Sequence, residues 1–229
     1  MQVIILADGD VGTRAALDDA WPGWLSSDQV VIAADGGARH ARPLSLRLDR
    51  WVGDGDSIDE AALAALTASG IPIERARPDK DESDTELAIL AGLRLGPTAV
   101  TVLGALGGPR LDHALANLGL LAMPELRRLD VRLVAADARV RYVQAPTLDD
   151  APVTLVLEGP VGGGVSLLPV GDDVHGVTTS GLAYPLNDES LRIGRTLGLS
   201  NVRTDAVTAA VTIRSGRLLV VETPATLTA

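Results

Sequence analysis

The sequence contains no cysteine and no phenylalanine, and aromatic residues make up only 2% of its 229 residues. Without cysteine the chain has no disulfides, no thiolate metal ligands and no cysteine nucleophile. With so few aromatic side chains, a core must be built from Val, Leu, Ile and Ala, which fits the hydrophobic content of 46%. A chain of this length can bury a substantial core, as one large domain or as two smaller ones.

Basic charge is also scarce, because 20 Lys and Arg residues are outnumbered by 30 Asp and Glu residues, for a formal net charge of −10. A general nucleic-acid binder needs a basic surface to neutralise phosphates, so this class is not expected. A small anionic ligand is still compatible with the composition, because a local site and a Mg²⁺ ion can override the global field. The histidines His40, His113 and His175 lack the spacing of zinc ligands.

Long hydrophobic runs are absent as well. No stretch of about 18 uncharged apolar residues occurs, so no membrane-spanning helix and no membrane partner are predicted. The first residues have no basic start, and their apolar run is too short for a secretory signal. We therefore expect a soluble, cytoplasmic protein.

Residues 1–143 alternate between short β-branched runs and helical patterns. Strands are expected over residues 3–7, 29–34, 50–52, 71–74, 98–103, 131–135 and 140–143, and helices over residues 58–69, 84–95 and 112–121. This alternation predicts an α/β domain whose parallel sheet is covered by helices on both faces. In such sheets, ligands bind outside the carboxyl ends of the strands.

After about residue 145 the helical periodicity disappears. Short alternating strands are expected over residues 153–157, 165–169, 174–178, 207–213 and 218–222, the last two forming a hairpin. The pattern predicts a small antiparallel β-sandwich or barrel. The predicted organisation is an α/β domain over residues 1–146 and a β-sandwich domain over residues 151–229.

Two carboxylates, Asp54 and Asp56, follow the strand expected over residues 50–52 in the sequence Gly-Asp-Gly-Asp-Ser, which ends at Ser57. Carboxylates this close repel each other unless a proton or a cation separates them. Mg²⁺ is usually held by one or two carboxylates together with phosphate oxygens and water. Taken alone, however, Gly-Asp-Gly-Asp is better explained as a surface turn.

Two further segments are ambiguous in the same way. Asp35-Gly36-Gly37 lies where a strand meets a helix start, so its free amides could bind phosphate, although a tight turn explains it better. In the segment 79–86, Lys80 could contact phosphate oxygens, and Asp81 or Asp84 could complete a Mg²⁺ shell. The spacing of Ser83 and Glu86 is equally that of a helix-capping box.

A glycine-rich loop over residues 104–110 leads into the helix expected at residue 112. Arg110 could bind phosphate oxygens in a bidentate manner. The loop is neither a Walker A motif nor the dinucleotide-binding fingerprint. The structural alternatives are a helix N-cap for Asp112 and a partly buried helix position for His113.

Together, the order and spacing of the four segments resemble the thiamine pyrophosphokinase family. That family carries an Asp-Gly-Gly turn, a Gly-Asp-x-Asp-Ser loop, a Lys-Asp-x-Thr-Asp segment and a Gly-Gly-Arg-x-Asp-His loop. They correspond here to residues 35–37, 53–57, 80–84 and 107–113, and further matches to the family's β-domain occur at 166–169, 181–186 and 200–201. Three positions depart from the family: Gly55 replaces a bulky residue, Ser83 replaces Thr, and Pro109 is inserted before Arg110.

The resemblance implies an enzyme that transfers a pyrophosphoryl group from ATP to thiamine, with Mg²⁺ as cofactor. Asp54, Asp56 and Asp84 would hold Mg²⁺, and Asp81 or Asp84 could accept the proton of the thiamine hydroxyl. The residues implied in nucleotide binding are Asp35, Gly36, Gly37, Ser57, Lys80, Ser83, Arg110, Asp112 and His113, and those in thiamine binding are Tyr184, Ser200 and Asn201. A homodimer with thiamine at the subunit interface is also implied.

Three alternatives keep part of this site. A pyrophosphokinase could use a pterin or another hydroxymethyl heterocycle as acceptor. A non-catalytic sensor could bind thiamine or a nucleotide without transfer. A metal-dependent glycosyltransferase could use the Asp-x-Asp loop, but it leaves the segments 80–84 and 107–113 unexplained.

Overall fold

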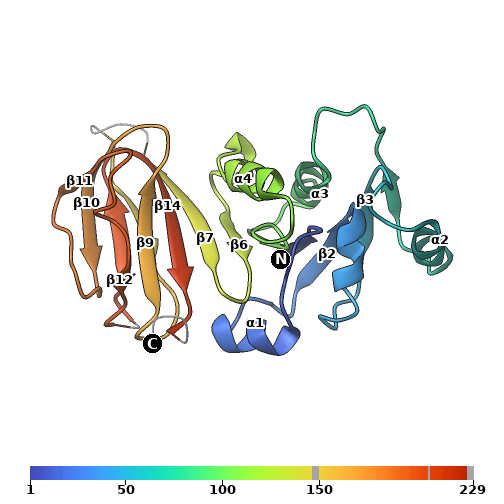
Figure 1. The fold of residues 1–229 in the computed structure, drawn as a ribbon, viewed down its shortest axis with the longest axis horizontal. Coiled ribbons are helices and arrows are strands. Elements are labelled where there is room, and N and C mark those ends of the chain that lie inside the picture. The colour runs from blue at the N-terminus through green and yellow to red at the C-terminus, as the bar shows by residue number, and fades with distance from the viewer. Residues whose placement is uncertain (146–149, 206, 226–229) are drawn as a thin grey trace. The chain divides into compact units, whose positions relative to one another are not determined.

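The computed structural model describes residues 1–145, 150–205 and 207–225, and Figure 1 shows the fold. The chain divides into two compact units, Met1–Ala136 and Asp137–Ala229. The division lies ahead of the boundary predicted at residues 146–151, because the strand at residues 139–145 pairs with a strand near the C-terminus. Residues 146–149 of the predicted boundary lie outside the described residues.

The first unit contains a parallel sheet with the strand order β6-β5-β1-β2-β3-β4. The strands are β1 (Gln2–Leu6), β2 (Gln29–Ala34), β3 (Arg50–Gly53), β4 (Ile73–Arg75), β5 (Ala99–Leu103) and β6 (Asp130–Val134). The chain builds outward from β1 to β4 and then returns to place β5 on the other side of β1. Such a reversal of strand order creates a crevice at the carboxyl ends of β1 and β5, where α/β sheets bind ligands.

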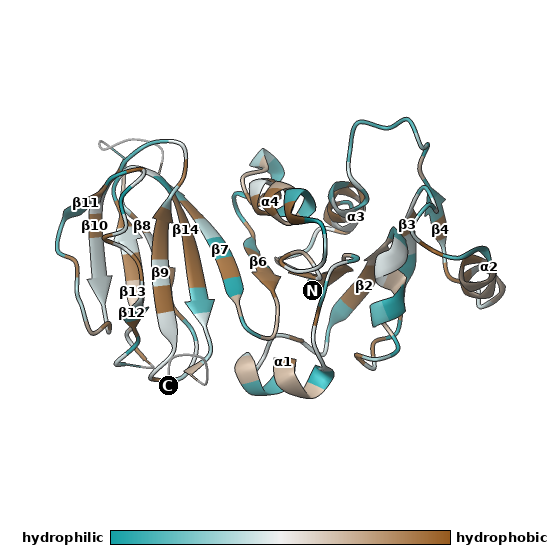
Figure 2. Cartoon of the chain, in the orientation of Figure 1, coloured by the Kyte–Doolittle hydropathy of each residue, from teal (hydrophilic) through white to brown (hydrophobic). Residues whose placement is uncertain are grey.

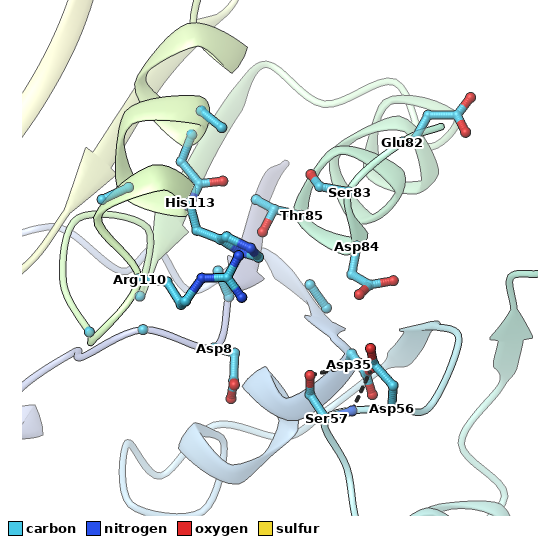
Figure 3. A pocket seen from close by; sticks show the side chains of 18 of the residues that line it. Asp8, Asp35, Asp56, Ser57, Glu82, Ser83, Asp84, Thr85, Arg110 and His113 are labelled. Carbon is cyan, nitrogen blue, oxygen red and sulfur yellow. Dashed lines mark hydrogen bonds between the residues drawn. The ribbon is translucent and has the colours of Figure 1, made fainter. Parts of the chain in front are cut away.

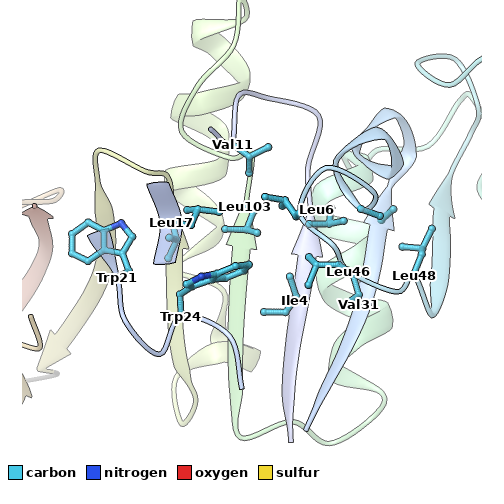
Figure 4. Close-up of a cluster of buried hydrophobic side chains, with 14 of the residues drawn as sticks. Ile4, Leu6, Val11, Leu17, Trp21, Trp24, Val31, Leu46, Leu48 and Leu103 are labelled. Atoms are coloured by element: carbon cyan, nitrogen blue, oxygen red, sulfur yellow. The ribbon is translucent and has the colours of Figure 1, made fainter. Parts of the chain in front are cut away.

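Helices cover both faces of this sheet, as predicted. The helices are α1 (Arg14–Ala20), α2 (Glu60–Ala68), α3 (Asp84–Leu93) and α4 (Leu111–Leu120), with short 3₁₀ segments η1 (Asp35–His40) and η2 (Pro124–Leu126). Leu17 of α1 packs with Ile4 and Leu6 in one buried cluster (Figure 4). Gly92 of α3 approaches Val3, which points to the opposite face because side chains alternate along a strand.

The expected strands and helices of this unit all occur, with ends that differ by up to two residues. Helix α1 was not predicted, because its seven residues present only Leu17 and Ala20 to the core, too few for a visible period. Figure 2 shows hydrophobic residues in β2 and β6 and a hydrophilic loop between β4 and α3. No helix in the described parts of the chain has both the length and the apolar character needed to cross a membrane.

The second unit is an antiparallel β-sandwich, as predicted. Its strands are β7 (Arg139–Ala145), β8 (Val153–Val156), β9 (Gly164–Pro169), β10 (Val174–Ser180), β11 (Glu189–Leu191), β12 (Asn201–Val202), β13 (Ala210–Ile213) and β14 (Gly216–Thr223). One sheet has the order β12-β9-β14-β7 and the other the order β11-β10-β13-β8. Aliphatic side chains from both, such as Leu167, Val177 and Leu218, form the shared core.

The predicted hairpin over residues 207–213 and 218–222 is wrong. Strand β13 pairs with β8 and β10, whereas β14 pairs with β7 and β9, so consecutive strands lie in opposite sheets. The chain changes sheets at Ser215, which forms a bridge to His175. Gly216 has a φ of +100°, and a Cβ there would lie 3.0 Å from Cα of Val174. The glycine therefore marks a corner between sheets, which alternation alone does not distinguish from a hairpin turn.

A buried network of ion pairs lies on the inner face of one sheet of this unit, next to the aliphatic core. Arg139 and Arg141 of β7 lie on the same face as Glu222 of β14, and all three are at most 5% exposed. Glu222 accepts from the Arg139 and Arg141 guanidinium groups at 2.9 Å each. Arg203 donates to the same carboxylate at 2.7 Å. Buried charges of this kind are tolerated when they are paired and hydrogen-bonded.

Candidate metal- and phosphate-binding site

A pocket of about 440 Å³ opens at the carboxyl ends of the strands of the first unit (Figure 3). Its lining comes from the loops that follow β1, β2, β3, β4 and β5 and from the starts of α3 and α4. The polar side chains that line it are Asp8, Asp35, Asp54, Asp56, Ser57, Lys80, Glu82, Ser83, Asp84, Thr85, Arg110, His113 and Asn117. The pocket therefore gathers side chains from all four of the segments singled out in the sequence.

Four carboxylates converge on one side of this pocket. Asp35, Asp54, Asp56 and Asp84 each offer one oxygen, and these four atoms all lie within 4.8 Å of one another. Asp35 follows β2, Asp54 and Asp56 follow β3, and Asp84 begins α3. An all-oxygen set of this kind fits a hard cation such as Mg²⁺, with substrate oxygens and water completing the shell. The set therefore contains the three residues predicted as metal ligands and, in addition, Asp35.

Asp35 is the most buried member of the set, at 2% exposed. Burial raises the pKa of its carboxyl group to about 6; the Ser57 N–H opposes this shift, and the negative charges of Asp84 and Asp56 add to it. Its Oδ2 accepts from the backbone N–H of Ser57 at 3.2 Å. Its Oδ1 is buried and has no hydrogen-bond partner among the described residues. A cation between the carboxylates would stabilise the ionised form that burial disfavours.

Lys80 connects two of these carboxylates. Its Nζ lies 2.5 Å from Oδ2 of Asp54 and 3.0 Å from Oδ1 of Asp84. Burial by itself would lower the pKa of Lys80, but hydrogen bonds to both carboxylates raise it above the ordinary value of 10.5. The hydrogen bond from Lys80 in turn lowers the pKa of Asp54. Lys80 therefore brings a permanent positive charge to the acidic side of the pocket.

The loop after β3 is held by its own hydrogen bonds. The N–H of Asp56 donates to Oδ1 of Asp54 at 3.1 Å, and the Ser57 hydroxyl donates to Oδ1 of Asp56 at 2.8 Å. Gly55 has a φ of +90°, a conformation that glycine adopts at little cost. A Cβ on Gly55 would also lie 3.0 Å from Nη2 of Arg75. The glycine that departs from the family pattern thus matches a loop conformation that favours glycine.

The glycine-rich loop after β5 packs against the residues that follow β1. The N–H of Gly9 donates to the carbonyl of Gly104 at 2.9 Å, and a Cβ on Gly9 would overlap the carbonyl oxygens of Gly104 and Gly107. Asn117, which is buried in α4, donates to the carbonyl of Ala105 at 3.1 Å and fixes the loop to the helix. Sequence reasoning missed Asn117, whose signal is a polar residue one turn after His113 on the same helix.

Asp8 is a second lining residue that sequence reasoning missed. It directly follows the buried run that ends β1 and forms an ion pair with Arg39 of η1. Arg39 also donates to the backbone carbonyl of Asp8. A Cβ on Gly36 would lie 2.5 Å from Oδ1 of Asp8, so Gly36 allows this carboxylate to reach the pocket. Gly37 likewise lies against the backbone of Leu6. Gly36 and Gly37, the two glycines predicted to bind nucleotide, are both buried, and each allows another segment of the chain to approach closely.

Arg110 and His113 lie across the pocket from Asp56 and Asp84 (Figure 3). The Arg110 guanidinium donates to both carboxylate oxygens of Asp112, at 3.0 Å and 2.7 Å. This hydrogen bond lowers the pKa of Asp112 to about 2. Helix α4 has Arg110 at its N-cap position, so the N-cap alternative for Asp112 is wrong. Both side chains are 64% exposed, which leaves the guanidinium accessible to an anionic ligand.

In the acidic segment 79–86, some residues line the pocket and others do not. Ser83 is the N-cap of α3, and its hydroxyl accepts from the N–H of Glu86 at 3.1 Å, as the capping-box spacing predicted. Ser83 and Asp84 both line the pocket. Asp81 is exposed and lies outside the pocket lining. Of the two carboxylates considered as proton acceptors, only Asp84 is therefore in the site.

The predicted thiamine-binding residues lie together in the second unit. The side chain of Asn201 is bonded to both backbone groups of Tyr184: it accepts from the N–H at 3.0 Å and donates to the carbonyl at 2.6 Å. Ser200 has a φ of +59°, and its N–H donates to the Ser166 hydroxyl at 3.1 Å. The buried Asn201 thus holds Tyr184, whose ring is 70% exposed. An exposed aromatic face beside polar groups is suited to a flat cationic ligand.

Two family models match this chain. Residues 22–133 match the model described as thiamin pyrophosphokinase, catalytic domain, and residues 154–218 match the model described as thiamin pyrophosphokinase, vitamin B1 binding domain. Together the two models cover most of the chain and separate near the division between its two units.

Individual relatives agree with the models. Thiamine pyrophosphokinase from Bacillus subtilis (strain 168) is 28% identical over 149 residues, which is 65% of this chain and 66% of the relative. Thiamine pyrophosphokinase 1 from Arabidopsis thaliana is 30% identical over 157 residues, which is 66% of this chain and 56% of the relative. The matched segments thus span slightly under two thirds of the first relative and just over half of the second.

Solved structures match over nearly the whole chain. A crystal structure of thiamine pyrophosphokinase from Bacillus subtilis has a TM-score of 0.79 at 22% identity and covers 98% of this chain and 99% of that one. Thiamin pyrophosphokinase from Candida albicans has a TM-score of 0.75 at 15% identity, covering 97% of this chain and 88% of that one. At these identities the likeness establishes a shared fold for both units.

Proposed function

Because this chain belongs to the thiamine pyrophosphokinase family, we propose that it transfers the pyrophosphoryl group of ATP to thiamine, giving thiamine diphosphate and AMP. The observation that carries this proposal is the pocket in which four carboxylates and Lys80 face Arg110 and the glycine-rich loop. In the transfer, the hydroxyethyl oxygen of thiamine bonds to the β-phosphorus of ATP. The bond from the β-phosphorus to the oxygen that bridges it to the α-phosphorus breaks, and AMP leaves.

The acidic side of the pocket would hold Mg²⁺ through Asp54, Asp56 and Asp84, with Asp35 beside them. The chemistry that Mg²⁺ supplies when bound is neutralisation of charge on the phosphate oxygens. The fit is supported by the donor set, which consists entirely of carboxylate oxygens, and by the buried Oδ1 of Asp35.

Other side chains of the pocket would align the triphosphate. Lys80 and Arg110 bring positive charge from two sides, Lys80 as a point charge and Arg110 as a planar fork. The hydroxyls of Ser57 and Ser83 and the ring of His113 supply further polar contacts around the same space. Reactions of this type depend mainly on alignment and charge neutralisation, which is what these residues can provide.

Asp84 is our choice for the group that accepts the hydroxyl proton of thiamine, because it lines the pocket and Asp81 does not. Thiamine would bind beside Tyr184, Ser200 and Asn201. We further propose a cytoplasmic homodimer with thiamine at the interface. The vitamin B1 binding model, which covers these three residues, favours thiamine over a pterin as acceptor. The complete acidic set argues against a sensor that binds without transfer.

The test is the release of AMP from ATP and Mg²⁺, measured with and without thiamine. We expect AMP and thiamine diphosphate to form in equal amounts and only when thiamine is present. Asp54→Asn and Asp56→Asn should abolish turnover while the circular dichroism spectrum stays that of the wild type. AMP formation that does not depend on thiamine would overturn the proposal, and near-wild-type rates in both variants would overturn the metal assignment.

A further inference from the structure

Asp35 has a backbone conformation that few residues other than glycine adopt. Its φ is +41°, in the left-handed region where Asp and Asn are the most frequent exceptions. Residues in this region persist when the surrounding structure enforces the conformation, and they cluster at functional sites. Here the conformation accompanies a buried carboxylate that belongs to the acidic cluster and whose Oδ1 has no hydrogen-bond partner among the described residues. The question is which contacts enforce it.

The neighbouring strand β3 supplies two of these contacts. The indole N–H of Trp51 donates to the backbone carbonyl of Asp35 at 3.0 Å, in a buried hydrogen bond. Two residues further along the same strand, a Cβ on Gly53 would lie 2.8 Å from Cβ of Asp35. Trp51 is itself fixed, because it is fully buried and pairs with Ala33 in the parallel register of β2 and β3. The Trp51 N–H thus anchors the peptide plane after Asp35, and Gly53 leaves room for its side chain.

The same strand leads directly into the metal loop. Asp54 follows the end of β3, and the N–H of Ser57 in this loop donates to Oδ2 of Asp35. One rigid element therefore sets both the carboxylates of the loop and the backbone of Asp35. A buried hydrogen bond to a residue of the acidic cluster is the kind of outer contact that tunes a metal site.

The other two tryptophans make comparable bonds away from the cluster. Trp21 donates its indole N–H to the carbonyl of Ala135 at 2.7 Å, and Trp24 donates to Oδ1 of Asp18 at 2.8 Å. Trp21 is 4% exposed and belongs to the same hydrophobic cluster as Trp51. Among the indole hydrogen bonds within the described residues, that of Trp51 is the one made to a residue of the acidic cluster.

We propose that Trp51 is a positioning residue for the cation site: its indole N–H holds the peptide after Asp35 so that the Asp35 carboxylate is turned into the cluster of Asp54, Asp56 and Asp84. This inference rests on the proposed function, because it requires that the cluster binds a divalent cation. Removal of the N–H with the ring retained should let the peptide rotate and withdraw the carboxylate. The affinity for a divalent cation then falls even when the core stays packed.

The test compares Trp51→Phe with Trp21→Phe in the full-length protein. Both variants replace a buried indole of one cluster with a smaller ring and remove one indole-to-carbonyl bond. Binding of Mn²⁺ is measured without nucleotide, from the electron paramagnetic resonance signal of free Mn²⁺, at a temperature well below the melting point of each variant. Trp51→Phe should weaken Mn²⁺ binding by about 10-fold, the low end of the effect of outer contacts on metal affinity. Trp21→Phe should lose comparable thermal stability and bind Mn²⁺ as the wild type does.

A wild-type Mn²⁺ affinity in Trp51→Phe, or an equal loss in Trp21→Phe, would overturn the proposal. If Trp51→Phe does not fold, benzothienylalanine at position 51 replaces the N–H with sulfur at nearly constant shape and is expected to give the same 10-fold loss. A different result is expected if the acidic cluster does not bind a divalent cation, as the proposed function requires. In that case Asp54→Asn and Asp56→Asn, each in an otherwise wild-type protein, would bind Mn²⁺ with wild-type affinity. This outcome does not depend on the tryptophan variants.

Discussion

Nζ of Lys80 lies 2.5 Å from Oδ2 of Asp54. The same nitrogen also pairs with Asp84, so one ammonium group joins the loop after β3 to the start of α3. Lys80 is the single lysine among the 20 basic residues of the chain. A lysine ammonium is a compact charge on a flexible stem, whereas a guanidinium is a rigid fork. The compact group fits between two carboxylates and can still turn toward a phosphate.

Replacement of Lys80 by Met should destabilise the protein and weaken its interaction with nucleotide. Without the ammonium, the partly buried Asp54 and Asp84 each lose a charged hydrogen-bond donor. Each loss costs at most about 3 kcal/mol of unfolding free energy. We expect a lower melting temperature in EDTA, a larger rise in that temperature on addition of Mg²⁺ than for the wild type, and a higher KM for ATP. Calorimetric scans with EDTA and with Mg²⁺ check the first two expectations, with Arg77→Met as an exposed control in the same loop.

The pKa of Lys80 can be measured directly because the chain has no other lysine side chain. Incorporation of lysine labelled with ¹³C at Cε should give a single side-chain signal and leaves the ammonium group with its hydrogen bonds unmodified. Hydrogen bonds to Asp54 and Asp84 overcome the opposing effect of burial, so the signal should titrate above the ordinary lysine value of 10.5. The stability that Lys80 contributes is therefore fully present below pH 10.5 and is lost as the pH rises through the higher folded-state pKa. A titration below 10.5 would contradict the ion-pair geometry.

The sequence predicted the parts of this protein that depend on local patterns. Alternating strands and helices predicted the parallel sheet, and they placed Asp35 and Asp54 just after strands, where α/β sheets bind ligands. The capping-box spacing predicted the bond from Glu86 to Ser83. In each case a few neighbouring residues contain the whole signal.

What the sequence did not predict depends on contacts between distant segments. The sheet change between β13 and β14 is set by the pairing of each with other strands. The hydrogen bond from Trp51 to Asp35 and that from Asn117 to Ala105 join residues whose proximity follows only from the folded backbone. In the sequence, Trp51 has the appearance of an ordinary core residue.

Arg110 offers a test of geometry at constant charge. Its guanidinium makes a bidentate contact with Asp112 through Nε and Nη2, a fork that a phosphate could also bind. Arg110→Lys keeps the charge and loses the fork, so kcat/KM for ATP should fall by about 10-fold or more, since each 1.4 kcal/mol of lost interaction is a factor of 10. Arg217→Lys, an exposed arginine of the second unit, should leave this constant unchanged. Equal kcat/KM values for Arg110→Lys and the wild type would remove Arg110 from the phosphate site.

Gly55 should resist substitution for two separate reasons. Its φ of +90° disfavours any residue with a Cβ, and the added atom would lie 3.0 Å from the Arg75 guanidinium. Gly70 has a φ of +75° but open space around it, so Gly70→Ala isolates the backbone effect. We expect the backbone effect to cost both alanine variants about 1 kcal/mol of unfolding free energy, and Gly55→Ala to lose more because of its contact with Arg75. Only Gly55→Ala should also raise the Mg²⁺ concentration needed for half-maximal activity, because it moves the loop that carries Asp54 and Asp56.

The Glu222 network predicts an acid transition that originates in the second unit. Burial raises the pKa of Glu222, but the charges of Arg141, Arg139 and Arg203 and the hydrogen bond from Arg139 outweigh burial, so the pKa lies below the ordinary value of 4.5. A carboxyl group whose pKa is lowered in the folded state stabilises the fold at pH values above its unfolded pKa, and this stability is lost as the pH falls through the folded value. The contribution of Glu222 to the wild-type unfolding free energy, measured by urea titrations, should therefore be constant above pH 4.5. It should decrease as the pH falls below 4.5.

Glu222→Gln should remove that dependence and lower the stability at neutral pH by about 3 kcal/mol, because three buried guanidinium groups lose their shared carboxylate. Glu189→Gln changes an exposed glutamate of β11 and serves as the matched control, with the wild-type profile expected. A Glu222→Gln protein as stable as the wild type at pH 7 would show that the network contributes little. If the variant is too unstable to titrate, the wild-type profile alone decides, because a wild-type stability that rises as the pH falls below 4.5 would contradict the lowered pKa.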